Sequence, residues 1–238
     1  MPTALSNLGP IKLYGLLQRR LDLTLSDFSE HWKTTHKIEA EKLSSFFSAY
    51  IQNHRLALNL PGYPVVCDGA PEIWFRSAED LIAMRMSAEY ETGAYVDELN
   101  FMHGRASGLV VSERTIRAGP IKQDDEKSVR VTFFIRKSAD ISEDAFSNWC
   151  ATHDAPAIDL QVPPSRHVRG KTLPSDEQPL YDAVESYWWQ SEEEALAALS
   201  DGALGLAARS VIDQRSCGIL CSTELPVKWP TSGVDYSS

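Results

Sequence analysis

Two histidines close matching segments of the chain, and a neutral imidazole can take up or release a proton near pH 7. Phe28, Trp32 and His36 are spaced four residues apart, so they share one face of a predicted helix. This helix is expected to begin at Ser26, whose side chain can cap it, and to reach about Phe47. The second segment repeats the order with one residue fewer: Phe146, Trp149, Thr152 and His153. His36 and His153 are thus the leading catalytic candidates, and the alternative for each is a core histidine bonded to a backbone carbonyl.

Further polar side chains lie on the strand predicted after each helix. Tyr50, Gln52 and His54 alternate with their neighbours, so they point to one face of that strand. Aligning the two Thr-His pairs places basic residues at the same positions of the second segment: His167, Arg169 and Lys171. If this face lines a chamber, Tyr50 and His54 are catalytic candidates, and His167 and Arg169 can bind a carboxylate or phenolate. The alternative is that these positions are solvated.

The tryptophans are, one at a time, more typical of core packing than of a binding site. Together they would suit a flat aromatic ligand in an apolar chamber. We assign four of them to that chamber: Trp32, Trp74, Trp149 and Trp188. The sequence has no histidines at metal-ligand spacing, no glycine-rich phosphate loop and no nucleophile elbow. We therefore expect no metal site.

The predicted elements occur in the same order on both sides of a polar segment. Residues 119–128 contain glycine, proline and several charges, and they form the predicted linker. Strand, helix, strand, strand, helix, strand is expected over residues 1–118 and again over residues 129–228, with a tail at 229–238. In each half a serine, Ser77 or Ser191, opens a capping-box pattern before the second helix. The repeat indicates a tandem duplication.

This order is typical of ferredoxin-like βαββαβ units of the α+β class. A four-stranded sheet with helices on one face leaves its other face uncovered. Trp74 and Phe75 nevertheless put bulky apolar groups on both faces of one strand. The simplest partner for the uncovered face is the other half of the chain. We predict two units packed sheet to sheet, closing an intramolecular α/β barrel with a cavity lined by both.

The composition excludes several classes of partner. The net charge of −10 over 238 residues argues against nucleic acid and anionic membranes. No apolar run reaches membrane-spanning length, and the N-terminus lacks the pattern of a signal peptide. The four cysteines form no Cys-x-x-Cys pair. We expect a cytoplasmic protein with reduced thiols, and the sequence leaves a homodimer open.

Several motifs together resemble the EthD family of the dimeric α/β-barrel superfamily. The first half carries Phe28-x-x-x-Trp32-x-x-x-His36, Asp68-Gly69-Ala70-Pro71-Glu72-Ile73-Trp74-Phe75, Ser77-Ala78-Glu79 and Asp97-Glu98-Leu99-Asn100-Phe101. The second half resembles a diverged copy of these motifs that lacks the Asp-Glu-x-x-Phe segment. The resemblance implies a cofactor-free barrel. Relatives include accessory proteins of ether degradation and dehydratases or decarboxylases of aromatic polyketides, and neighbouring families include haem-handling enzymes and cofactor-free monooxygenases.

The leading hypothesis for function is a cofactor-independent lyase of aromatic catabolism, either a decarboxylase or a dehydratase. Its substrate would be a small aromatic compound such as a phenolic acid, and histidine would move the proton. We expect His36→Ala or His153→Ala to abolish turnover. The alternatives are a cofactor-free monooxygenase and a non-catalytic accessory or ligand-binding protein.

Overall fold

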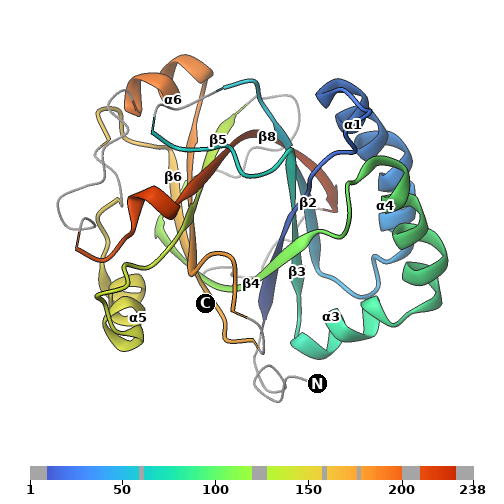
Figure 1. The fold of residues 1–238 in the computed structure, drawn as a ribbon, viewed down its shortest axis with the longest axis horizontal. Helices are drawn as coiled ribbons and strands as arrows, with labels where there is room; N and C mark the ends of the chain where they lie inside the picture. Colours follow the sequence, from blue (N-terminus) through green and yellow to red (C-terminus); the bar gives the residue numbers. More distant parts are fainter. Residues whose placement is uncertain are drawn as a thin grey trace.

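Eight strands close into an antiparallel barrel in the computed structural model of the chain, among the residues that it describes (Figure 1). These are residues 10–58, 62–119, 128–156, 160–175, 178–199 and 210–228. The predicted tail, and the predicted linker apart from its two end residues, lie outside them. The strands are β1 Ile11–Leu16, β2 Ala49–Arg55, β3 Gly69–Phe75, β4 Ser107–Arg117, β5 Val129–Ile135, β6 Arg166–Thr172, β7 Ala183–Trp189 and β8 Gly218–Lys228.

The helices lie outside the barrel in two groups, one beside each half of the sheet (Figure 1). The first half has α1 Leu25–His31, α2 Lys37–Lys42, α3 Ala78–Arg85 and α4 Tyr95–Phe101, with π-helical turns η1 Trp32–His36 and η2 Tyr90–Ala94. The second half has α5 Glu143–Thr152, α6 Glu192–Ala198 and the short 3₁₀ turn η3 Gln214–Ser216. The predicted order of strands and helices is confirmed in both halves. In the described part of the chain, no helix is both long and apolar enough to cross a membrane.

The barrel closes through its strand edges. Its order is β1-β3-β2-β8-β5-β7-β6-β4, so β2 pairs with β8 and β4 pairs with β6 across the two halves. Unpaired edge strands expose backbone donors and acceptors, and this closure gives each edge a partner. The predicted α+β barrel is therefore confirmed. Its halves meet by hydrogen-bonded edges rather than by stacking the faces of two separate sheets.

Side chains fill the inside of the barrel. Arg130 on β5 donates to Tyr14 Oη on β1 over 2.9 Å and pairs with Glu72 on β3. These contacts cross the interior, because β5 is adjacent to neither β1 nor β3. Lys12 Nζ lies 2.8 Å from a Glu72 oxygen and 2.6 Å from a Glu113 oxygen. An apolar cluster that includes Leu16, Ala70, Leu109, Val111, Phe134, Val184 and Leu220 adjoins these charges.

The strand face that was expected to line a shared chamber points toward the helices instead. On β2, Asn53 accepts a hydrogen bond from the interior arginine over 3.2 Å, so its neighbours Gln52 and His54 point outward. Tyr50 shares their face, and its Oη accepts a hydrogen bond from Trp32 Nε1 in the helix layer over 3.2 Å.

The second half follows the same rule. Lys171 Nζ on β6 donates to Ser147 Oγ on α5 over 2.6 Å, so His167 and Arg169 also face the helices. The expectation that these residues line one chamber between two sheets is therefore wrong. Alternation shows which side chains share a face, but it does not show which face the helices cover.

The first helix begins one residue before α1. Thr24 Oγ1 accepts from the Asp27 backbone N–H over 3.1 Å, and the Asp27 carboxylate accepts from the Thr24 backbone N–H over 3.3 Å. This reciprocal capping box needs an acid three residues after the cap, which Thr24 has. The cap predicted at Ser26 is therefore wrong by two residues.

The π turn η1 interrupts this helix over Trp32–His36. A π turn accommodates one residue more than the corresponding α-helical turn. His36 follows Phe28 by eight positions, whereas His153 follows Phe146 by seven, and the difference falls between the phenylalanine and the tryptophan. The counterpart helix α5 is regular and stops before His153, which forms its C-cap. The two Thr-His pairs therefore lie in different backbone settings.

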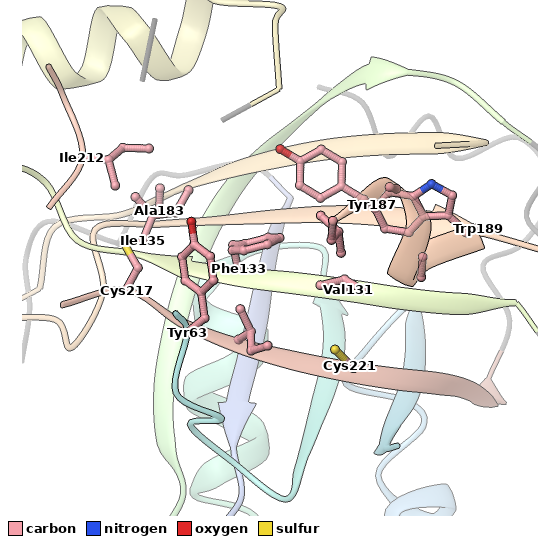
Figure 2. Packing of buried hydrophobic residues seen from close by; sticks show 14 of the residues in the cluster. Tyr63, Val131, Phe133, Ile135, Ala183, Tyr187, Trp189, Ile212, Cys217 and Cys221 are labelled. Carbon is pink, nitrogen blue, oxygen red and sulfur yellow. The ribbon is translucent and has the colours of Figure 1, made fainter. Parts of the chain in front are cut away.

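The helix-facing side of the second half is a dense apolar core (Figure 2). Phe133 packs edge-on against Tyr63 and Tyr187, with ring centroids 5.1 and 5.9 Å apart. Val131, Trp189 and the residues of α5 and α6 that face the sheet surround them. Large rings thus occupy the layer between helices and sheet in this half.

Candidate active site

A cavity of about 520 Å³ lies between the helices and the sheet of the first half. The sheet contributes Leu13 and Ile73, and the helix layer contributes side chains from both π turns. Aromatic and polar groups share the lining: Trp32, His36, Tyr50, Tyr90, Tyr95, Glu98 and Phe101. The volume falls within the roughly 300–1,000 Å³ of small-molecule sites.

Small side chains on the sheet make room for this cavity. β1 pairs with β3 and β5 pairs with β7 in the same register, so positions in the two halves can be matched. By this register Gly15 and Pro71 correspond to Phe133 and Glu185. A Cβ on Gly15 would lie 2.7 Å from Pro71 Cγ, which places the two side by side in the cavity floor. The cavity therefore lies where the second half has a phenyl ring.

His36 is held against an aspartate at the wall of the cavity. Its Nδ1 lies 2.9 Å from Asp97 Oδ2, and the residue is 7% exposed. The ring also packs on Phe101, with centroids 5.0 Å apart. An ionised Asp97 accepts the Nδ1–H, so Nε2 is the nitrogen that a ligand in the cavity can reach.

Three donors hold the Asp97 carboxylate in this position. His31 Nε2 lies 2.9 Å from Oδ1, Asn100 Nδ2 donates to Oδ1 over 3.3 Å, and His36 occupies Oδ2. Burial alone would raise the pKa of Asp97, but the hydrogen bonds from His36, His31 and Asn100 outweigh it and hold that pKa at about 2. Asp97 is thus ionised at neutral pH.

A second acid, Glu98, directly follows Asp97 in α4 and lines the cavity. Tyr90 Oη is 3.4 and 3.5 Å from the two Glu98 carboxylate oxygens. Burial raises the pKa of Glu98, and burial together with the Glu98 charge raises the pKa of Tyr90 to about 12. The pair therefore offers the cavity a weakly acidic carboxyl and a neutral phenol.

Two arginines and a tyrosine line the cavity where it meets the surface. Arg105 is exposed, and it donates to Tyr95 Oη over 3.2 Å and lies over the Tyr95 ring. Arg85, also exposed, lies on α3 at the same rim. Cations at the rim attract an anionic ligand.

Of the two catalytic candidates predicted on β2, Tyr50 lies at the cavity and His54 does not. Tyr50 lines the cavity, and burial raises its pKa to about 12. His54 lies behind Trp32, with ring centroids 4.6 Å apart, and outside the cavity lining. Burial lowers the pKa of His54 to about 4, so it is neutral at pH 7.

The predicted site residues of the second half lie away from this cavity. Arg169 donates to the carbonyls of His153 and Ala155 at the end of α5, over 2.6 and 2.9 Å. It also donates to Glu185 over 2.6 Å, and His167 Nε2 lies 2.5 Å from the same oxygen. His153 stacks on Trp149 with centroids 5.8 Å apart.

The remaining two tryptophans pack beside cations of the barrel interior. Lys12 Nζ lies 4.1 Å from the Trp74 ring, and the Arg130 guanidinium lies 4.5 Å from the Trp188 ring. Of the residues selected from the sequence, the structure thus brings His36, Trp32 and Tyr50 together.

Sequence reasoning missed the partners of His36. Asp97 and Glu98 were noted only as part of a family motif, and Tyr90 and Arg105 were not selected. The signal was present, because Asp97 and Phe101 are four residues apart and so face one way on a helix. Both contact His36. Within the described residues, no group of three or more His, Cys, Asp or Glu side chains is placed to hold a metal ion.

Comparison with known proteins agrees with this geometry. Residues 20–105 match the EthD domain, a range that contains His36, Asp97 and much of the cavity lining, so the resemblance of the first half is confirmed. Curated protein sequences give no match.

Solved structures share the fold across nearly the whole chain. An anthrone oxidase-like protein is 12% identical with a TM-score of 0.59, covering 97% of this chain and 99% of its own. A candidate monooxygenase from Fusobacterium nucleatum is 9% identical with a TM-score of 0.55, covering 98% and 99%. A chlorite dismutase variant from Candidatus Nitrospira defluvii is 12% identical with a TM-score of 0.51, covering 93% of each chain. At such identities the likeness shows the fold alone.

Proposed function

We propose that this chain is a cofactor-independent enzyme that moves a proton on a small aromatic substrate, with His36 as the acid–base residue. The observation that carries the proposal is the 2.9 Å contact between His36 Nδ1 and the ionised Asp97 at the wall of an aromatic cavity. A carboxylate on Nδ1 fixes the tautomer and stabilises the imidazolium that forms during proton transfer. The Nε2 side is then directed to the substrate.

The reaction that suits this cavity best is the decarboxylation of a phenolic acid. An imidazolium at His36 gives its Nε2 proton to the ring carbon that carries the carboxylate. The carbon–carboxylate bond then breaks, its electron pair stays in the ring, and carbon dioxide leaves. Each turnover consumes one proton, which water returns to His36. An apolar chamber favours uncharged carbon dioxide over the bound carboxylate, because burial destabilises an unpaired charge.

Other groups in the cavity support a phenolic substrate. The Glu98 carboxyl and the Tyr90 and Tyr50 hydroxyls can hydrogen-bond a ring hydroxyl. The arginines at the rim would attract the acid. The same arrangement permits dehydration, in which His36 removes a proton from carbon and returns it to the leaving hydroxyl.

A cofactor-free monooxygenase is the second candidate. Two proteins of this fold are described as anthrone oxidase-like and as a candidate monooxygenase. His36 would act as the base, taking a proton from a phenol or an adjacent carbon so that the resulting anion reacts with oxygen. The two candidates share the proton transfer and differ in the consumption of oxygen.

We also propose that the two halves arose by tandem duplication. The matching strand order, the matching registers of β1–β3 and β5–β7 and the serine caps of α3 and α6 support it. The first half then retained the cavity, whereas the second filled it.

The test follows carbon dioxide release and oxygen uptake with a panel of hydroxylated aromatic acids and anthrones. We expect His36→Ala and Asp97→Asn to lose at least ~100-fold in turnover, the lower range for removing an acid–base group. The matched control is His103→Ala, which removes an exposed histidine. Oxygen uptake without carbon dioxide would select the monooxygenase. Saturable binding without product would select a carrier, and full activity of His36→Ala would reject His36 as the catalytic group.

A further inference from the structure

We propose that the π turn η1 is a positioning device for His36 and that Gln52 on β2 locks it. This inference rests on the proposed function for its catalytic meaning, but the positioning itself can be measured without a substrate. Gln52 becomes in this view a positioning residue, separate from the groups that touch substrate.

The two π turns of the described residues lie beside the cavity. Both π-helical turns in the described part of the chain contribute side chains to the cavity: Trp32 and His36 from η1, and Tyr90 and Ala94 from η2. An added residue rotates everything after it by about 100° around a helix with 3.6 residues per turn. The π turn therefore sets the direction in which His36 points relative to Phe28 and Trp32. All three are buried.

A buried side chain on β2, that of Gln52, contacts the π turn. The Gln52 amide Nε2 donates to the backbone carbonyl of Trp32 over 3.0 Å, and Gln52 has no exposed surface. Trp32 is the first residue of η1. A side chain that bonds to the helix ladder is a known cause of local helix distortion. The strand thus holds the helix through a hydrogen bond at the first residue of the π turn.

A hydrogen-bond network fixes the Gln52 side chain itself. Its Oε1 lies 2.9 Å from His54 Nε2, and His54 Nδ1 lies 2.7 Å from Ser29 Oγ on α1. A neutral His54 with its proton on Nε2 donates to Gln52 and accepts from Ser29. The amide of Gln52 is then oriented with its N–H toward Trp32. The network runs from Ser29 on α1 through β2 to Trp32, so one strand holds the helix at the start of the π turn.

The second half offers a comparison. Arg169 stands at the position that matches Gln52, and it bonds the carbonyls of His153 and Ala155 at the end of a regular helix. There the strand side chain caps the helix C-terminus, and His153 lies at its C-cap. The matched positions hold helix carbonyls in both halves, but a π turn is held in the first half alone among the described residues.

The primary test is NMR of protein labelled with ¹⁵N-histidine, with no ligand added. We expect a downfield Nδ1–H proton for His36 bonded to Asp97, assigned by its loss in His36→Ala. Gln52→Met keeps the length of the side chain and removes the amide, so the Nδ1–H signal should be lost and the tautomer should become mixed. The matched control is Thr172→Val, which removes another buried donor to a backbone carbonyl, that of Tyr181.

Deletion of Lys33, an exposed residue of η1, tests the same device independently and decides the matter if Gln52→Met does not fold. It should also abolish the signal while the circular dichroism remains that of a folded protein. Retention of the signal in a folded Gln52→Met or Lys33-deleted protein would overturn the proposal, as would equal loss in Thr172→Val.

Activity gives a second readout. Gln52→Met should lower turnover at least ~10-fold in the wild-type background and cause no further loss in a His36→Ala background, because groups acting as a unit are non-additive. If no substrate is found but the NMR result holds, the proposed function fails and the positioning stands.

Discussion

At the scale of single residues, environment separates histidines that look alike in the sequence. His36 has a carboxylate partner and an aromatic cavity beside it. His54 has a serine and an amide as partners and lies in the packed layer behind Trp32. A carboxylate stabilises the charged imidazole, whereas neutral partners in a buried place favour the uncharged form. The first arrangement suits proton transfer, and the second suits structure.

The burial of His54 predicts acid sensitivity. Its pKa is lowered from 6.5 to about 4, mainly by burial, so the unfolded chain binds more protons between these values and stability falls as the pH drops through that window. We expect the free energy of unfolding to lose about 2 kcal/mol between pH 8 and pH 5 through this group. Urea unfolding at both values should show the loss in the wild type and a smaller loss in His54→Phe. An equal loss in both proteins would assign the acid sensitivity elsewhere.

At the scale of elements, local pattern predicted most of the structure. The strand at 166–172 and the serine caps Ser77 and Ser191 are found where they were expected, because alternation and capping are encoded within a few residues. The π turn was not predicted, because the four-residue spacing of Phe28, Trp32 and His36 also fits an unbroken α-helix. The Asp97 partner was missed for a related reason: it lies 61 residues from His36, and only packing brings them together.

The barrel interior depends on one side chain from the second half. Arg130 has no exposed surface and bonds Glu72 and Tyr14 of the first half. We expect Arg130→Met to cost about 3–5 kcal/mol in the free energy of unfolding, the range for removing one partner of a buried pair, because the buried Glu72 carboxylate keeps Lys12 but loses its arginine partner. Adding Glu72→Gln should recover part of this loss, since it removes that charge. Chemical unfolding of the two single variants and the double variant measures the coupling, and strictly additive costs would contradict it.

At the scale of the whole molecule, the two halves share a topology but differ in how the helix layer is filled. Gly15 and Pro71 leave space under the helices of the first half, whereas Phe133 and Glu185 occupy the matching places in the second. Glu185 is fully buried, and burial works to raise its pKa, but the charge of Arg169 and the His167 contact outweigh this and lower it. The second half thus has a buried ion pair where the first has a cavity.

This asymmetry revises the expectation that both Thr-His pairs are needed for turnover. His153 caps a helix, stacks on Trp149 and receives hydrogen bonds on its backbone carbonyl, which alanine would retain. We therefore expect His153→Ala to keep turnover within about 3-fold of wild type and to lose about 1 kcal/mol of stability, the value of an aromatic contact. His36→Ala should show the opposite pattern, with turnover lost and the fold retained. Measuring turnover and urea unfolding on both variants separates the roles, and a loss of turnover in His153→Ala as large as in His36→Ala would show that catalysis needs both halves.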